Sequence, residues 1–204
     1  MSGDHPKLIL DGTKTMTRRV IVPQPPTLED GSLLFSWRNM PQVHSPYGQV
    51  GDRLWVRETH YRYGHWNKNG LTKTGRQKWT FKPDREVVRF TDDIPIVVSQ
   101  GKKYVGWYKR PSIFMPRWAS RIMLEITELR VERVQEIGVE DCLAEGLLTE
   151  FHSGDIDGMS LVHSDLLGQF HNLWDSLNAK RGYGWDTNPW VWVIGFKLLE
   201  PDDA

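Results

Sequence analysis

The segment Asp11-Gly12-Thr13-Lys14-Thr15-Met16-Thr17-Arg18-Arg19 gathers a lysine, three threonines and two arginines near the start of a 204-residue chain. Gly12 permits a turn because it has no Cβ. Lys14 and Thr17 are three residues apart, which makes them neighbours on a helical turn but places them on opposite faces of a strand. If the two side chains act together, the backbone must therefore turn or kink within this segment.

The composition fits one globular domain covering residues 1–204. At 39% apolar and 25% charged residues, the chain can bury a sizeable core. Lys plus Arg (26) equals Asp plus Glu (26), so the net charge does not favour a polyanionic partner, although local charge can. The single cysteine, Cys142, excludes an intrachain disulfide and a cysteine zinc site, and it indicates the cytoplasm.

Two further patterns bear on metals and membranes. The seven histidines match no ligand spacing of a metal site, so we expect no metal. Met1–Leu10 is too polar for a signal peptide or a membrane span, so we expect no membrane association.

Alternating apolar residues predict three main strands. The first lies in 51–58, the second is one bulged strand or two paired strands over 121–134, and the third is a largely buried closing strand over 190–198. Weaker strand signals occur at 86–90, 94–99 and 103–108.

Helices and loops complete the predicted architecture. A short helix is expected over 139–146 and an amphipathic helix over 166–177. Polar stretches without periodicity predict loop insertions near 27–46, 61–82 and 151–163. The fold class is therefore α+β, with a small curved sheet or barrel and helices at its ends.

Two charged features each allow two interpretations. Glu145 lies at the C-terminal end of the predicted 139–146 helix, where a negative charge is unfavourable, so an exposed helix acid is the simpler interpretation for this residue alone. From Ile94 to Leu124 there is no acidic residue, while lysines and arginines alternate with aromatic residues. That stretch is either a solvated rim over core aromatics or a face on which bases stack and phosphates bind.

Five blocks of the sequence resemble the ASCH domain of the PUA-like superfamily, in particular the long version found in bacteriophages and prophages. They fall in the order of the family and span nearly the whole chain. The blocks are Gly12-Thr13-Lys14-Thr15-Met16-Thr17-Arg18-Arg19, Gly51-Asp52-Arg53-Leu54-Trp55-Val56-Arg57-Glu58, 111–121, Ala144-Glu145-Gly146 and Asn188-Pro189-Trp190-Val191-Trp192. The resemblance implies a small PUA-like β-barrel with flanking helices and a cleft for RNA or a modified nucleobase.

The resemblance also implies an activity. A small bacterial member of the same domain class, an N4-acetylcytidine amidohydrolase, is similar at Lys14, Thr17 and Glu145. Carried over, Thr17 is the nucleophile, Lys14 the base, and Glu145 the acid or orienting group. A scheme in which Glu145 activates water and Lys14 polarises the carbonyl is equally open. No cofactor is implied.

The expected partner is a modified cytidine nucleoside or RNA. Substrate contacts are expected from six further residues, which are Arg18, Arg19, Arg57, Glu58, Arg117 and Trp118. Two other functions use the same surface. One is a non-enzymatic RNA-binding module, which would add Trp107, Lys109 and Arg110. The other is a metal-independent ribonuclease with lysine and glutamate as acid and base.

Overall fold

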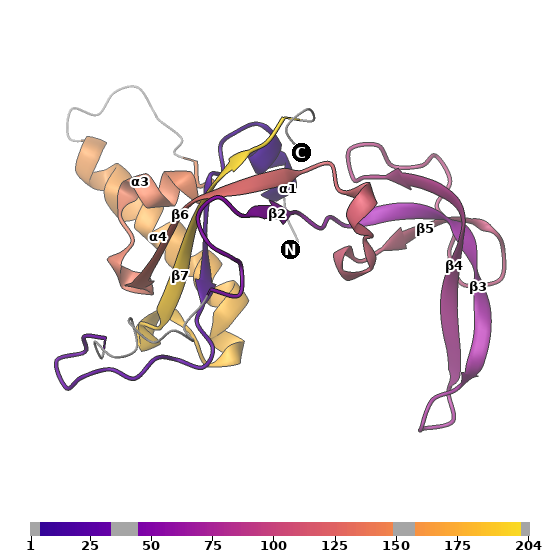
Figure 1. Ribbon diagram of the computed structural model, residues 1–204, viewed down its shortest axis with the longest axis horizontal. Helices are drawn as coiled ribbons and strands as arrows, with labels where there is room; N and C mark the ends of the chain where they lie inside the picture. The colour runs from indigo at the N-terminus through magenta and orange to yellow at the C-terminus, as the bar shows by residue number, and fades with distance from the viewer. Residues whose placement is uncertain (1–4, 34–44, 149–157, 201–204) are drawn as a thin grey trace. The chain divides into compact units, whose positions relative to one another are not determined.

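A computed structural model describes residues 5–33, 45–148 and 158–200 (Figure 1). The chain divides into two compact units. The first, called here the hairpin unit, is Trp55–Arg121. The second, called the sheet unit, combines Ser2–Leu54 with Ile122–Ala204.

The sheet unit is built on a four-stranded sheet with the order β1-β7-β6-β2. Its strands are β1 (Met16–Val20), β2 (Arg53–Trp55), β6 (Met123–Arg133) and β7 (Trp190–Leu198). β7 pairs antiparallel with β1 and with β6, and its first seven residues are buried. A central strand covered on both faces has apolar residues at consecutive positions, which explains the run Trp190 to Phe196. The sheet curls (Figure 1).

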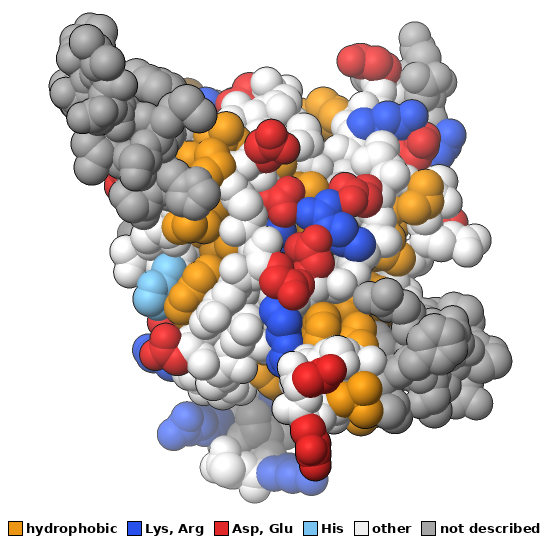
Figure 2. All heavy atoms as spheres, turned by 90° about the vertical axis from the view of Figure 1, so that its left-hand side faces the viewer, with side chains coloured by type: hydrophobic (Ala, Val, Ile, Leu, Met, Phe, Trp, Pro, Cys, Tyr) orange, Lys and Arg blue, Asp and Glu red, His pale blue; other side chains and the backbone are white. Residues whose placement is uncertain are grey.

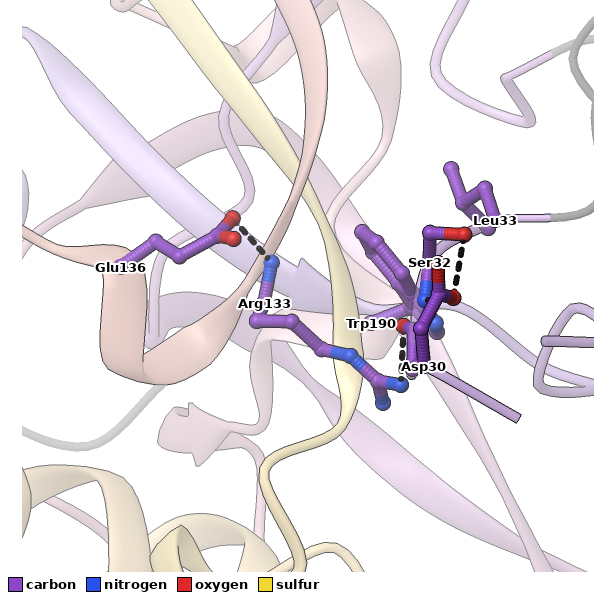
Figure 3. A pocket seen from close by; sticks show the side chains of 7 residues that line it. Asp30, Ser32, Leu33, Arg133, Glu136 and Trp190 are labelled. Atoms are coloured by element: carbon purple, nitrogen blue, oxygen red, sulfur yellow. Dashed lines mark hydrogen bonds between the residues drawn. The ribbon is translucent and has the colours of Figure 1, made fainter. Parts of the chain in front are cut away.

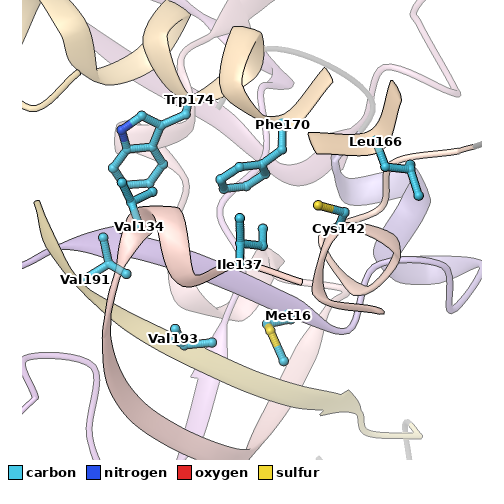
Figure 4. Packing of buried hydrophobic residues seen from close by; sticks show 9 residues of the cluster. All are labelled: Met16, Val134, Ile137, Cys142, Leu166, Phe170, Trp174, Val191 and Val193. Carbon is cyan, nitrogen blue, oxygen red and sulfur yellow. The ribbon is translucent and has the colours of Figure 1, made fainter. Parts of the chain in front are cut away.

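Helices cover one face of this sheet. α1 (His5–Leu10) precedes β1, and its Leu8 lies near Gly146. The helices on the covered face are α3 (Val139–Ala144) and α4 (Gly158–Asn178). The main core lies between them and the sheet, where Leu166, Phe170 and Trp174 of α4 pack on Val191 and Val193 (Figure 4). A second cluster occupies the other face of the sheet and comprises Ile21, Ile126, Trp190, Trp192 and Ile194.

The hairpin unit is a three-stranded antiparallel sheet with the order β4-β3-β5. Its strands are β3 (His60–Leu71), β4 (Gln77–Arg89) and β5 (Gly106–Arg110). Gly75, with φ 76°, closes the β3–β4 turn through a 2.9 Å hydrogen bond from its N–H to the Thr72 carbonyl. Short 3-10 helices in the described parts are η1 (Ser112–Phe114), η2 (Arg117–Ala119), η3 (Val134–Glu136), η4 (Ala179–Arg181) and η5 (Trp185–Thr187).

Most strand and helix predictions are confirmed. The α+β class is confirmed. The predicted helices over 139–146 and 166–177 correspond to α3 and α4, and the predicted closing strand corresponds to β7. β6 is one long strand whose pairing shifts between Ile126 and Glu128, as a bulged strand requires.

The loop predicted over 61–82 and the strand predicted over 94–99 were wrong, the strand predicted over 103–108 begins only at Gly106, and two predicted loops fall largely outside the described residues. The segment 61–82 is not a loop but most of the β3–β4 hairpin. The segments 94–99 and 103–105 form no strand, apart from an isolated bridge between Val98 and Trp107. Of the predicted loops, 34–44 and 151–157 lie outside the described residues, while 158–163 belongs to α4.

Candidate functional site

Lys14 and Glu145 form a buried ion pair in the sheet unit. The Lys14 Nζ donates hydrogen bonds of 2.6 Å to the Oε2 atom and 2.6 Å to the backbone carbonyl of Glu145. The side chains are only 4% and 6% exposed. The fold therefore brings together two of the three predicted catalytic residues across 131 positions of sequence.

The local backbone explains why this pair can form. α1 ends in a turn at Gly12 (φ 79°), and the Lys14 N–H then donates to the Leu8 carbonyl at 2.8 Å. Gly146, with φ 89°, ends α3, and a Cβ there would lie 3.2 Å from the Lys14 Cβ. The lysine thus passes close to the helix end, where its charge is favourable beside the free carbonyls. This cation offsets the unfavourable position of Glu145 on its helix.

Arg18 holds the other oxygen of the Glu145 carboxylate. Its backbone N–H donates to Oε1 at 2.6 Å. Its guanidinium, with a fully buried side chain, bonds Asp141 and, at 3.3 Å, Glu132. Both carboxylate oxygens of Glu145 are therefore fixed in direction by donors, a condition for an orienting or basic group.

A second layer of charge surrounds Arg18. Arg130 donates to Asp141 at 2.7 Å and also bonds Glu128 and Glu132. Although burial opposes it, the hydrogen bonds and charges of Arg18 and Arg130 lower the pKa of Asp141. Figure 2 views the side of the molecule that carries α3 and α4, and there acidic and basic side chains lie side by side.

Burial lowers the pKa of Lys14 from its ordinary value. Glu145 opposes this shift by charge and hydrogen bonding, whereas the nearby charges of Arg19 and Arg18 reinforce it. A buried lysine with a lowered pKa is suited to proton transfer.

His5 of α1 lies within electrostatic range of Lys14, which the sequence did not indicate. Burial lowers its pKa first, and the Lys14 charge lowers it further. Its Nδ1 atom is buried and has no hydrogen-bond partner within the described ranges. No spacing or motif marks this histidine, because only the packing of α1 brings it near Lys14.

Thr17 lies on the opposite face of β1 from Arg18. Met16 packs in the main core, whereas Thr17 pairs with Ile194 of the second cluster. Its side chain is half-buried, and in the described part of the chain its hydroxyl has no hydrogen-bond partner. The nucleophilic role of Thr17 stays a prediction.

The remaining predicted substrate residues fall in both units. Arg19 of β1 is half-buried and donates to the Arg18 carbonyl at 3.1 Å. In the hairpin unit, the exposed Arg57 lies 4.6 Å from the ring centre of Trp55. Arg117 and Trp118 are exposed on η2, with the Arg62 guanidinium 5.4 Å from the Trp118 ring.

Glu58 is different from these surface residues. It is buried and receives two hydrogen bonds from Arg121, at 3.0 and 2.9 Å. Arg121 also bonds Asp92 at 2.7 Å. Both carboxylate oxygens of Glu58 are therefore engaged by Arg121 within the hairpin unit.

A pocket of about 420 Å³ lies elsewhere on the sheet unit. The Arg133 guanidinium lies 4.3 Å from the ring centre of Trp190 at this pocket, and Glu136 accepts from the Arg133 N–H at 2.8 Å (Figure 3). The other lining residues are Asp30, Gly31, Ser32 and Leu33. None of the predicted catalytic residues lines it.

The described residues contain neither a helix that could span a membrane nor a side-chain cluster that could hold a metal ion. No helix there has the length and apolarity needed to cross a membrane. No cluster of three or more His, Cys, Asp or Glu side chains there could hold a metal ion.

Comparisons with known proteins add one similarity. No family model and no curated protein matches the sequence. A crystal structure of an ASCH domain from Lactobacillus crispatus JV V101 is similar to this chain, with 12% sequence identity and a TM-score of 0.34. The match covers 97% of this chain and 75% of that one. A likeness this distant leaves the function to be argued from the site itself.

Proposed function

We propose that this protein is an amidohydrolase that cleaves the exocyclic N4-acyl amide of N4-acetylcytidine or a related N4-acylated cytidine. The observation that carries the proposal is the buried pair of Lys14 and Glu145, joined at 2.6 Å. Such a pair is costly to bury, and buried lysines with a lowered pKa, such as Lys14, concentrate at functional sites. The substrate class rests on the sequence resemblance at Lys14, Thr17 and Glu145.

The geometry favours water over Thr17 as the nucleophile. The carboxylate of Glu145 is oriented by Lys14 and Arg18. The Thr17 side chain lies on the face of β1 opposite the Arg18 side chain, where Thr17 pairs with Ile194 of the second cluster. In this scheme Glu145 takes a proton from water as the water oxygen attacks the acyl carbon, and Lys14 stabilises the oxyanion. The C–N bond then breaks, and the proton passes from Glu145 to the N4 atom. The products are cytidine and the free carboxylic acid.

The direct test is to incubate the purified protein with N4-acetylcytidine and measure cytidine by chromatography. Lys14→Ala and Glu145→Gln are each expected to lower kcat about 10²- to 10⁴-fold, the usual contribution of an acid–base group. Lys7→Ala and Glu140→Gln are matched controls, because both residues are exposed on the neighbouring helices α1 and α3.

Thr17→Ala separates the two schemes. Retained activity supports water as the nucleophile, and loss equal to that of Lys14→Ala supports Thr17. No cytidine from any N4-acylated cytidine, or full activity in Lys14→Ala, would overturn the proposal. Metal-independent degradation of RNA by the same preparation, lost in Lys14→Ala, would replace it with a ribonuclease.

A further inference from the structure

The neutral total charge of this protein hides a strong division between its two units. Residues 55–121 contain 15 of the 26 Lys and Arg residues but only 5 of the 26 Asp and Glu residues. The hairpin unit therefore carries a formal charge of +10, and the rest of the chain carries −10. A charge of this size on 67 residues favours a polyanionic partner.

The positive charge continues to the tip of the β3–β4 hairpin. β5 pairs with β3 only over His60–Gly64, so residues 65–82 form a two-stranded ribbon that extends beyond the third strand. No acidic residue occurs from 59 to 83. Five cations of this ribbon are exposed, and within the described parts of the chain none is in an ion pair; they are Lys68, Lys73, Arg76, Lys78 and Lys82.

The base of the ribbon is a packed aromatic cluster. Trp66, Phe81 and Tyr108 meet edge to face, with ring centres 5.3 to 6.0 Å apart. Cations already cover these rings, since the Arg110 guanidinium lies 4.8 Å from Trp66 and the Lys102 Nζ 5.1 Å from it. These faces are therefore occupied within the protein, so the ribbon is better suited to binding phosphates than to stacking on unpaired bases.

We propose that the outer β3–β4 ribbon, residues 65–82, is an arm that binds duplex DNA. The major groove of B-form DNA, about 12 Å wide, admits a two-stranded β-ribbon. Seven residues of a strand at roughly 3.3 Å each give the arm a length of about 23 Å, enough to follow the groove while its cations reach phosphates on both sides. Duplex RNA has a deep, narrow major groove that excludes such a ribbon. This inference does not depend on the amidohydrolase activity.

The salt dependence of binding measures the number of phosphates contacted. If all five ribbon cations contact phosphates, a plot of log affinity against log salt concentration has a slope of about −4.5. The affinity then drops about 500-fold between 50 and 200 mM salt.

The experiment uses the full chain and a labelled 20-base-pair duplex DNA, with binding followed by fluorescence anisotropy. The triple variant Lys73→Gln/Arg76→Gln/Lys78→Gln leaves two ribbon cations, so its affinity is expected to drop only about tenfold over the same salt range. Lys180→Gln/Arg181→Gln is the control, since it removes exposed cations from the sheet unit. Circular dichroism verifies that each variant is folded.

DNA binding by the arm is supported if the affinity of the wild type depends steeply on salt, the triple variant has a shallower slope, and the control variant has the slope of the wild type. Four results would overturn it: no binding to duplex DNA at 50 mM salt, an unchanged slope in the triple variant, an equal loss in the control, or tighter binding to duplex RNA or single strands. Amidohydrolase activity in the triple variant on free N4-acetylcytidine distinguishes failure of the arm from failure of the proposed reaction.

Discussion

Replacing Glu145 by Gln is expected to destabilise the sheet unit by about 3 to 5 kcal/mol, because it leaves a buried ammonium without its countercharge. Lys14 is 4% exposed, and Glu145 supplies the charge and the hydrogen bonds that oppose the effect of burial on the lysine. Removing both charges, in Lys14→Met/Glu145→Gln, should recover much of this loss. The expected coupling between the two sites is then about 2 kcal/mol or more.

The assay is urea unfolding of the wild type, the two single variants and the double variant, followed by tryptophan fluorescence. Lys197 and Glu125 provide the control cycle, since their 3.0 Å pair is 57% and 30% exposed. Exposed pairs contribute about 0 to 1 kcal/mol. A coupling below about 1 kcal/mol for Lys14 and Glu145, or one equal to the control, would refute the reasoning.

The same burial predicts a pH signature for Lys14. Because its pKa is lowered in the folded state, the unfolded chain binds the proton more tightly between that lowered value and the ordinary 10.5. Stability contributed by this group therefore rises as the pH increases through that window. The measurement is the unfolding free energy of the wild type minus that of Lys14→Met, from pH 7 to 10.5. This difference should increase with pH, and a constant difference would contradict a lowered pKa of Lys14.

Two further outcomes follow from the surroundings of this pair. Gly146→Ala is expected to cost about 1 to 2 kcal/mol, because its φ of 89° is unfavourable for a residue with a Cβ and that atom would press on Leu8 and Lys14; Gly138→Ala, with open space around it, is the control in the same unfolding assay. Cys142 is fully buried, and burial raises the pKa of its thiol to about 11. We therefore expect no alkylation of the native protein at pH 7.5 by mass spectrometry and complete alkylation in urea, and rapid labelling without denaturant would contradict this burial.

The parts of the fold predicted from sequence are those whose residues alternate between a buried and an exposed face. β6 and α4 show this periodicity directly, and β7 shows the apolar run of a central strand. The hairpin over 61–82 was missed because its apolar alternation is limited to Trp79 and Phe81 of β4, while residues 67–71 of β3 are all exposed. Its strands depend instead on the turn at Gly75 and on cross-strand pairs such as Trp66 with Phe81.

The candidate site was predictable only in part. The partnership of Lys14 with Glu145 was expected from the resemblance alone, since no local pattern links residues 131 positions apart. The contacts of Arg18 with Asp141, and the place of His5, depend on how α1 and α3 pack against β1. Strand periodicity predicted that Lys14 and Thr17 would lie on opposite faces of a strand. In the structure Thr17 pairs with Ile194 of the second cluster.

The position of Glu145 also bears on the solubility of this protein. β1 is an edge strand, and its outward N–H at Arg18 is taken by the Glu145 carboxylate. Unpaired N–H groups at a sheet edge are templates for strands of other molecules, and a charged group placed against such an edge prevents this pairing. Glu145 thus shields this edge of the sheet against intermolecular β-pairing, so substitutions that remove its side chain promote self-association in addition to removing a buried charge.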